Sequence, residues 1–216
     1  MDAREMQGKR QVAAGRPWGT IFGLAFIVFY VSLTIIAITR FPHPVSPSDL
    51  FLSALGNADL SPDGAIFYNL GVILGGLAEI LFFIAIYAHY SQFGRRWILI
   101  IGLIAGLIFG VSVSMSGIYP EYPNMDEHEA WSYLIFFSMI PLLLAFSLAF
   151  LGMRGTSRWV SLYGFLVCVI NVIFLALILS DRQGSIMEWV TVILYLIWVL
   201  LVSLDVLKRA RARSPV

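Results

Sequence analysis

The chain has 216 residues, of which 59% are hydrophobic and 12% are charged, and its formal net charge is +1. Soluble domains carry about a quarter charged residues, and a water-soluble fold of this size cannot hide so much apolar surface, so the composition excludes an ordinary soluble protein. A net charge near zero also gives no overall field that would attract nucleic acid. We therefore expect an integral membrane protein that has membrane lipids, and no nucleic acid, as partners.

Six apolar stretches have the length of about 20 residues that a helix needs to cross the hydrocarbon core of a bilayer. They lie at residues 17–39, 65–89, 97–118, 131–151, 159–179 and 187–207. A membrane barrel is not expected, because its strands are shorter and alternate apolar with polar residues. No linker divides the stretches, so we predict an all-α integral membrane protein in which residues 1–216 form a single domain, a bundle of six transmembrane helices.

The basic residues predict the orientation of this bundle. Twelve of the 14 Lys and Arg residues fall on one side of it, namely Arg4, Lys9, Arg10, Arg16, Arg95, Arg96, Arg154, Arg158, Lys208, Arg209, Arg211 and Arg213. The other side keeps Arg40 and Arg182 together with most of the acidic residues. Because loops rich in Lys and Arg stay in the cytoplasm, we predict a multi-pass protein of the cell membrane with a cytoplasmic N-terminus and C-terminus.

The longest connection, residues 40–64, lies on the predicted outer side. Ser46 to Asp49 reads as a helix start, with a capping serine, a proline at the first helical position and an acid at the third. Apolar residues follow, and Gly56 is a natural stop. We predict a short interfacial helix in this first outer loop.

Glycines recur at helical spacing in the second and third spans. The third span contains Gly102, Gly106 and Gly110, and the second contains Gly71 and Gly75, with Gly76 beside them. Small residues let helix backbones approach closely, which matters in lipid because lipid tails compete equally for apolar contacts. The pattern predicts that these two helices pack tightly, face to face.

An acidic residue, Glu79, falls near the middle of the second span. An ionised carboxylate is costly in hydrocarbon, so we expect this group to be protonated, paired or hydrated. Asn171, near the middle of the fifth span, is a candidate partner. Two interpretations follow: Glu79 is a proton carrier or substrate ligand, or Glu79 and Asn171 form a hydrogen bond that joins two helices.

Other acids are predicted to begin helices. Asp126 and Glu129 have the spacing of a capping box at the start of the fourth span, and Ser185 and Glu188 have it at the start of the sixth. Acids at a helix start also complement the helix dipole. We therefore assign these four residues to local helix capping.

A polar cluster remains on the outer side after the capping residues are set aside. Ser114 ends the third span, Glu121 and His128 follow it, and Asn69 opens the second span. One histidine among acids has no metal-ligand spacing, so neither a metal nor another cofactor is predicted. A histidine such as His128 can serve as a general acid or base, and with Glu121 it forms the candidate catalytic pair.

Four short segments carry a resemblance to a known family. They are Ser53-Ala-Leu-Gly56-Asn57, Phe67-Tyr-Asn69-Leu-Gly71, Gly117-Ile-Tyr-Pro120-Glu121 and His128. Together they resemble the prokaryotic DUF998 family of six-span membrane proteins of unknown function. The chain departs from that pattern at Tyr68, which is inserted between a phenylalanine and an asparagine, and at Tyr119, which replaces a phenylalanine.

A weaker similarity extends to eukaryotic DRAM and Sfk-type membrane proteins, which are associated with membrane-lipid organisation and lipid-anchor remodelling. The resemblance implies that Ser53, Asn69, Glu121 and His128 belong to one site. The orientation predicted from the charges places all four on the outer side.

Three functional hypotheses follow. The first is that the protein binds or modifies a lipid or lipid-linked substrate at the outer leaflet, with Ser53, Asn69 and Ser114 among the substrate-binding residues; no nucleophile is identified, so no reaction is predicted. The second is a proton-coupled transporter of a small solute that uses Glu79, with Asn171 beside it. The third is a non-enzymatic membrane scaffold or assembly factor. A homo-oligomer is open under each.

Overall fold

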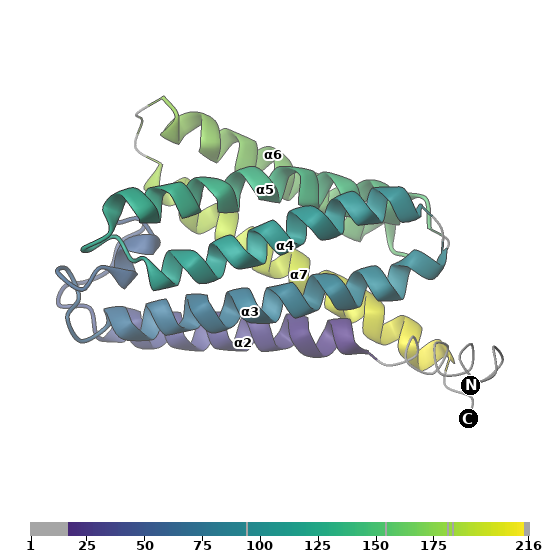
Figure 1. Ribbon diagram of the computed structural model, residues 1–216, viewed down its shortest axis with the longest axis horizontal. Coiled ribbons are helices and arrows are strands. Elements are labelled where there is room, and N and C mark those ends of the chain that lie inside the picture. Colours follow the sequence, from purple (N-terminus) through teal and green to yellow (C-terminus); the bar gives the residue numbers. More distant parts are fainter. Residues whose placement is uncertain (1–16, 94, 154, 181, 183, 214–216) are drawn as a thin grey trace.

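Six long helices account for most of the residues that the structure describes (Figure 1). The computed structural model describes residues 17–93, 95–153, 155–180, 182 and 184–213. The long helices are α2 (Trp18–Thr39), α3 (Ala65–Tyr90), α4 (Arg96–Ile118), α5 (Met125–Leu151), α6 (Arg158–Ile178) and α7 (Ser185–Arg213). Each is long and apolar enough to cross a membrane. The predicted all-α bundle of six spans is confirmed, and the protein is a multi-pass membrane protein.

The helix boundaries differ from the predicted spans mainly at two ends. α5 begins at Met125 instead of residue 131, and α7 runs to Arg213 instead of ending at residue 207. A helical backbone satisfies its own hydrogen bonds wherever its side chains lie, so a helix continues beyond its apolar part into polar sequence. Hydropathy marks only the part of each helix that suits hydrocarbon.

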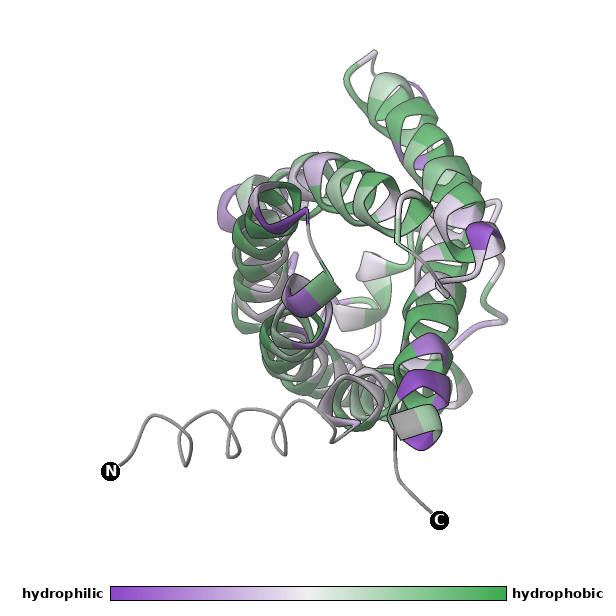
Figure 2. Cartoon of the chain, turned by 90° about the vertical axis from the view of Figure 1, so that its right-hand side faces the viewer, coloured by the Kyte–Doolittle hydropathy of each residue, from purple (hydrophilic) through white to green (hydrophobic). Residues whose placement is uncertain are grey.

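Consecutive helices pack side by side in chain order, and α7 returns to contact α2. Seen along the bundle, the helices enclose a central core, while α6 lies outermost and contacts α5 and α7 (Figure 2). We call the end with the connections 40–64, 119–124 and 179–184 the loop end (Figure 1). The opposite end, where α2 begins, the 3-10 helix η2 (Ser91–Phe93) lies and α7 ends, is the terminal end.

Glycines join α3 to α4, but the glycine of α3 at this contact is Gly76, whereas the predicted Gly71 and Gly75 face α2. A side-chain carbon at Gly76 would lie 2.6 Å from the carbonyl oxygen of Gly110, and one at Gly110 would lie 3.0 Å from the carbonyl oxygen of Gly76. Only residues without side chains allow backbones to approach so closely. Gly102 instead faces the ring of Phe146 on α5, so only part of the predicted glycine stripe belongs to this seam.

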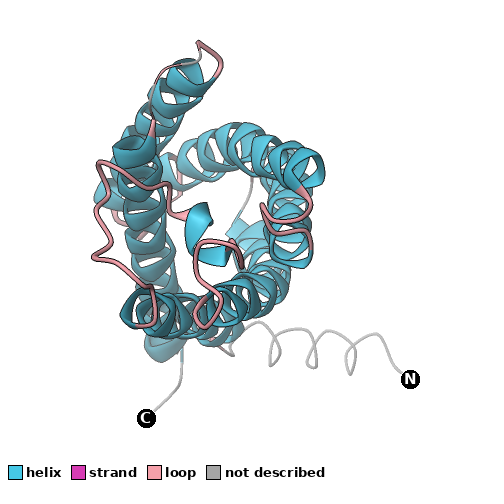
Figure 3. Ribbon diagram, turned by 90° about the vertical axis from the view of Figure 1, so that its left-hand side faces the viewer, coloured by secondary structure: helices cyan, strands magenta, loops and turns pink. Residues whose placement is uncertain are grey.

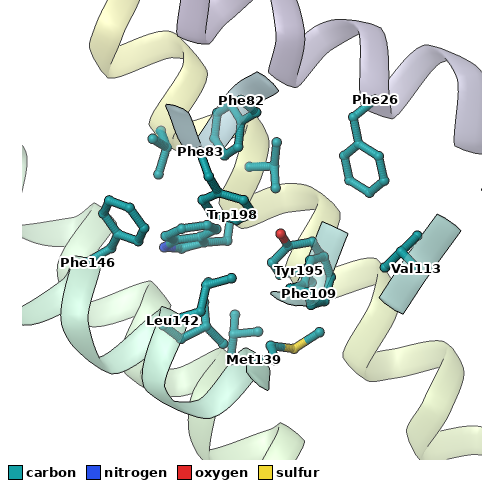
Figure 4. Packing of buried hydrophobic residues seen from close by; sticks show 14 of the residues in the cluster. Phe26, Phe82, Phe83, Phe109, Val113, Met139, Leu142, Phe146, Tyr195 and Trp198 are labelled. Atoms are coloured by element: carbon teal, nitrogen blue, oxygen red, sulfur yellow. The ribbon is translucent and has the colours of Figure 1, made fainter. Parts of the chain in front are cut away.

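Aromatic side chains fill the centre of the bundle (Figure 4). Phe83 of α3 stacks on Phe146 of α5 with ring centroids 5.8 Å apart. Tyr195 and Trp198 of α7 stack on each other at 5.9 Å. Trp198 is fully buried, because α7 turns this face toward the bundle and not toward lipid.

Residues 40–64 fold back over the loop end of the bundle (Figure 3). Only Ser53–Gly56 form a helix there, the 3-10 helix η1. Residues 47–49, where the short interfacial helix was predicted to begin, form a turn, so that helix is not shown. Leu52 is 2% exposed and Leu55 is 0% exposed, because apolar side chains lose more contact with water inside the bundle than at its rim. We call residues 50–57, which close the loop end, the plug.

Candidate functional site

A cavity of about 70 Å³ lies at the loop end, under the plug, with room for several water molecules. Aromatic residues that line it are Phe26, Tyr30, Tyr68, Phe109, Phe136 and Tyr195. Polar residues that line it are Ser53, Ser116, His128, Ser132 and Glu188. These residues come from η1 and from every long helix except α6. A mostly apolar hollow with a few convergent polar groups is typical of a ligand site.

His128, in the first turns of α5, is held by one ring nitrogen. Its Nδ1 lies 2.9 Å from the carbonyl oxygen of Tyr119 and 3.3 Å from that of Ser116. Carbonyl oxygens only accept hydrogen bonds, so Nδ1 carries the hydrogen and Nε2 of the neutral ring is an acceptor. Nε2 is buried and has no hydrogen-bond partner among the described residues. Held this way, the imidazole accepts a hydrogen bond or a proton from a ligand at the cavity wall.

Glu188 is a site residue that the sequence analysis missed. Its Oε2 accepts a hydrogen bond of 2.7 Å from the backbone N–H of Leu52 in the plug, and its side chain lines the cavity. The predicted capping box is therefore wrong, because a buried plug donor attracts this carboxylate more strongly than its own helix start does. A signal was present: Glu188 falls inside the predicted span 187–207, where an acid is unusual.

Ser185, the other member of that predicted box, also serves a different purpose. Ser185 donates its hydroxyl to the carbonyl oxygen of Ser48 at 3.1 Å, so it ties α7 to the loop. Trp189 supports the same contact, since its Nε1 donates to the carbonyl oxygen of Leu50 at 2.9 Å. At α5 the capping position is Asn124, and no side chain bonds there. The start of α7 thus acts as an anchor for residues 48–52.

Ser53 and Glu121 meet as the family resemblance implied. Ser53 Oγ donates to Glu121 Oε1 at 2.9 Å, and Asn57 Nδ2 donates to Glu121 Oε2 at 3.4 Å. Ser53 lines the cavity, whereas Glu121 does not. Glu121 therefore holds the plug in place through Ser53 and Asn57, but it does not line the cavity that His128 faces.

Asn69 and Ser114 contact backbone groups and do not line the cavity. Asn69 Nδ2 donates to the carbonyl oxygen of Gly56 at 2.9 Å, which fixes the end of η1. Ser114 Oγ lies within hydrogen-bond distance of the carbonyl oxygens of Gly110 (3.1 Å) and Ile73 (3.3 Å). The contacts of these two predicted binding residues position the cavity walls.

Glu79 is fully buried in α3, and its partner is not the one predicted. Tyr195 donates its hydroxyl to Glu79 Oε1 at 3.1 Å. Asn171 instead donates to the carbonyl oxygen of Phe136 at 2.8 Å. The predicted pairing of Glu79 with Asn171 is wrong because α6 lies outside the ring, where it contacts α5 and α7. Since Tyr195 also lines the cavity, it links Glu79 to that hollow.

A second polar network closes the terminal end. Asp205 Oδ2 accepts a hydrogen bond of 2.7 Å from the Tyr90 hydroxyl and forms an ion pair of 2.8 Å with Arg209 Nε. The guanidinium of Arg209 also contacts the Thr156 hydroxyl and lies 5.5 Å from the centre of the Tyr90 ring. Within the described residues, no group of three or more His, Cys, Asp or Glu side chains is placed to hold a metal ion.

Comparison with known proteins gives one match. A family model described as a protein of unknown function (DUF998) matches residues 21–205, which include every residue of the cavity wall. No curated protein and no solved structure matches the chain. The weaker similarity to DRAM and Sfk-type proteins is therefore not confirmed.

Proposed function

The chain belongs to the DUF998 family of proteins of unknown function, and from that premise we propose that it binds the polar end of a lipid or lipid-linked molecule in its loop-end cavity. One observation carries this proposal: His128 Nε2, buried and without a partner among the described residues, belongs to a side chain in the wall of a hollow that is otherwise mostly apolar. Apolar walls suit an amphiphile, and a few polar groups set its orientation.

The charges flanking the helices support an outward-facing cavity. At the terminal end the described residues include Arg95, Arg96, Arg158, Lys208, Arg209 and Arg211, while Arg4, Lys9, Arg10, Arg16 and Arg154 lie outside the described residues. At the loop end the only described basic residues of this kind are Arg40 and Arg182. By the positive-inside rule, the termini are cytoplasmic and the cavity faces the outer leaflet of the cell membrane.

A cavity-filling substitution tests the proposal. Val113 lines the cavity, so Val113→Phe should fill part of it, whereas Val111, 45% exposed on the same helix, points away from the core. We expect wild type and Val111→Phe purified in mild detergent to carry the same native lipid species by mass spectrometry. Val113→Phe should lose it, and His128→Ala should retain less.

The His128 variant guards against a folding defect in the larger substitution, because it removes a polar atom without adding volume. Equal retention of every lipid species by wild type, Val113→Phe and His128→Ala would contradict a ligand site in this cavity.

The contact between Tyr195 and Glu79 favours a second candidate, a proton-coupled transporter. Tyr195 lines the cavity and donates to the buried Glu79. The Tyr195 hydroxyl would therefore connect a proton on Glu79 with a solute bound in the cavity. None of the six long helices is interrupted, whereas transporter sites usually contain broken helices. Uptake of labelled small solutes into proteoliposomes under a pH gradient distinguishes the two functions: transport requires a flux that Glu79→Gln reduces, and equal flux would remove Glu79 from the mechanism.

A further inference from the structure

Aromatic rings surround the cavity from several directions. Tyr30 of α2 and Tyr68 of α3 meet edge to face with centroids 6.2 Å apart, and their hydroxyl oxygens are 3.5 Å apart. Phe109 of α4 lies 4.8 Å from Tyr195 of α7, and Phe26 of α2 lies 6.2 Å from the same ring. Aromatic faces attract cations within about 6 Å of their centroids. Three helices besides α7 thus contribute to a set of rings that suits a positively charged group.

Two side chains at the cavity, Glu188 and His128, offer acceptor atoms. Glu188 Oε2 accepts from the Leu52 N–H, and among the described residues no basic side chain forms an ion pair with Glu188. His128 is 7% exposed and leaves Nε2 without a partner in the described part of the chain. A carboxylate taken from water without a counter-charge is costly, so a cation in the cavity would relieve this cost.

The side chains that line the cavity also provide no permanent positive charge, as far as the chain is described. Among the described residues, the cavity lining contains one carboxylate and no Lys or Arg side chain. A phosphate or carboxylate placed there would meet Glu188 in a medium that screens charge poorly. Anionic ligands are therefore disfavoured, and uncharged ones would leave the carboxylate unpaired.

We infer that the cavity binds an ammonium group, held by Glu188 and His128 on one side and by the rings of Tyr30, Tyr68 and Phe109 on the other. This inference rests on the proposed function and names its ligand class. The volume of about 70 Å³ suits the small ammonium end of a molecule, not a whole lipid. The ammonium comes from an amine-bearing lipid head group or from a soluble amine.

The experiment measures the thermal unfolding midpoint in nanodiscs, because a ligand that binds only the folded state raises it. One arm compares phosphatidylethanolamine with phosphatidylglycerol as the bulk lipid. A second arm adds choline or ethanolamine to phosphatidylglycerol nanodiscs, with the uncharged isostere dimethylbutanol as the control. A rise in the first arm alone identifies a lipid head group, and a rise in the second identifies a soluble amine.

Variants tie the effect to the cavity. Glu188→Gln should weaken the apparent affinity for the amine, measured from the rise of the unfolding midpoint, at least tenfold. Tyr30→Leu should weaken this affinity to a similar degree. Tyr30→Phe keeps the ring and should retain the rise, as should Val111→Phe, whose side chain is exposed on the outside of the bundle. Two variants are expected to lose the rise and two to keep it, so the test stays valid if one variant fails to fold.

The remaining outcomes overturn one proposal or both. No rise with any amine, or an equal rise in Glu188→Gln and Tyr30→Leu, overturns the ammonium inference. If an anionic or uncharged amphiphile stabilises wild type and Val113→Phe abolishes that effect, the lipid-binding function stands while the ammonium inference fails. If Val113→Phe changes no ligand response, the cavity is not the site and both fail.

Discussion

A buried carboxylate lies at each end of the bundle, and the two carboxylates have different partners. At the terminal end Asp205 is neutralised by Arg209 and also bonded by Tyr90. At the loop end Glu188 is held by the backbone N–H of Leu52 and has no ion pair among the described residues. The first arrangement completes a structure, because charge and hydrogen bonds are satisfied within the chain. The second lies beside a cavity, which is why we propose binding for the loop end and a structural role for the terminal end.

The largest expected effect tests the terminal end. Asp205→Ala should lower the free energy of unfolding by about 3–5 kcal/mol, because it removes the ion pair with the mostly buried Arg209 and the acceptor of the Tyr90 hydroxyl. Unfolding of the purified protein in detergent measures the change, with Glu188→Gln as the loop-end control. If both variants lose the same stability, the two ends do not differ in the way described.

The next largest effect tests the close backbone contact between α3 and α4. Gly76→Ala should cost about 1–3 kcal/mol, because the added carbon would lie 2.6 Å from the backbone oxygen of Gly110, which cannot move alone. Gly75→Ala is the matched control, since the nearest neighbour of its added carbon would be a side chain, that of Phe26 at 3.2 Å, and not a backbone atom. Equal losses at the two neighbours would show that close backbone approach is not what joins α3 to α4.

A smaller effect is expected from Glu188→Gln, which tests whether the carboxylate at the loop end is as important for stability as Asp205. The amide oxygen still accepts from the Leu52 N–H, so we expect a loss of only about 1 kcal/mol of stability. The plug should keep its place, which hydrogen exchange at the amide of Leu52 measures. A loss as large as that of Asp205→Ala would mean that Glu188 is a structural group like its counterpart.

The smallest effect concerns the anchor of the loop. Trp189→Phe removes the hydrogen bond to the carbonyl oxygen of Leu50, at a cost of about 0.5–1.5 kcal/mol. Hydrogen exchange should speed up in residues 48–57 and stay unchanged at 91–95, at the other end of the bundle. Faster exchange at both ends would indicate a global loss of stability and not a local one.

Some residues of the site could be predicted from the sequence and others could not. His128, Glu121 and Ser53 were predicted from residue types and from the family resemblance, and the structure places them around the plug. Glu188 was assigned to a local cap, because its true donor, Leu52, is 136 positions away in the chain. The aromatic wall was missed because tyrosines and phenylalanines in a span resemble ordinary membrane residues.

The sequence by itself determined the six helices and their order, because hydrocarbon forces each segment to satisfy its own backbone hydrogen bonds. It also indicated that glycines bring helices close together in lipid, but the structure decided that Gly76 meets α4 while Gly71 and Gly75 meet α2. Only the tertiary structure decided which polar groups share a cavity. Those groups come from helices distant in sequence, and the plug that covers them is positioned by side-chain contacts that no local pattern encodes.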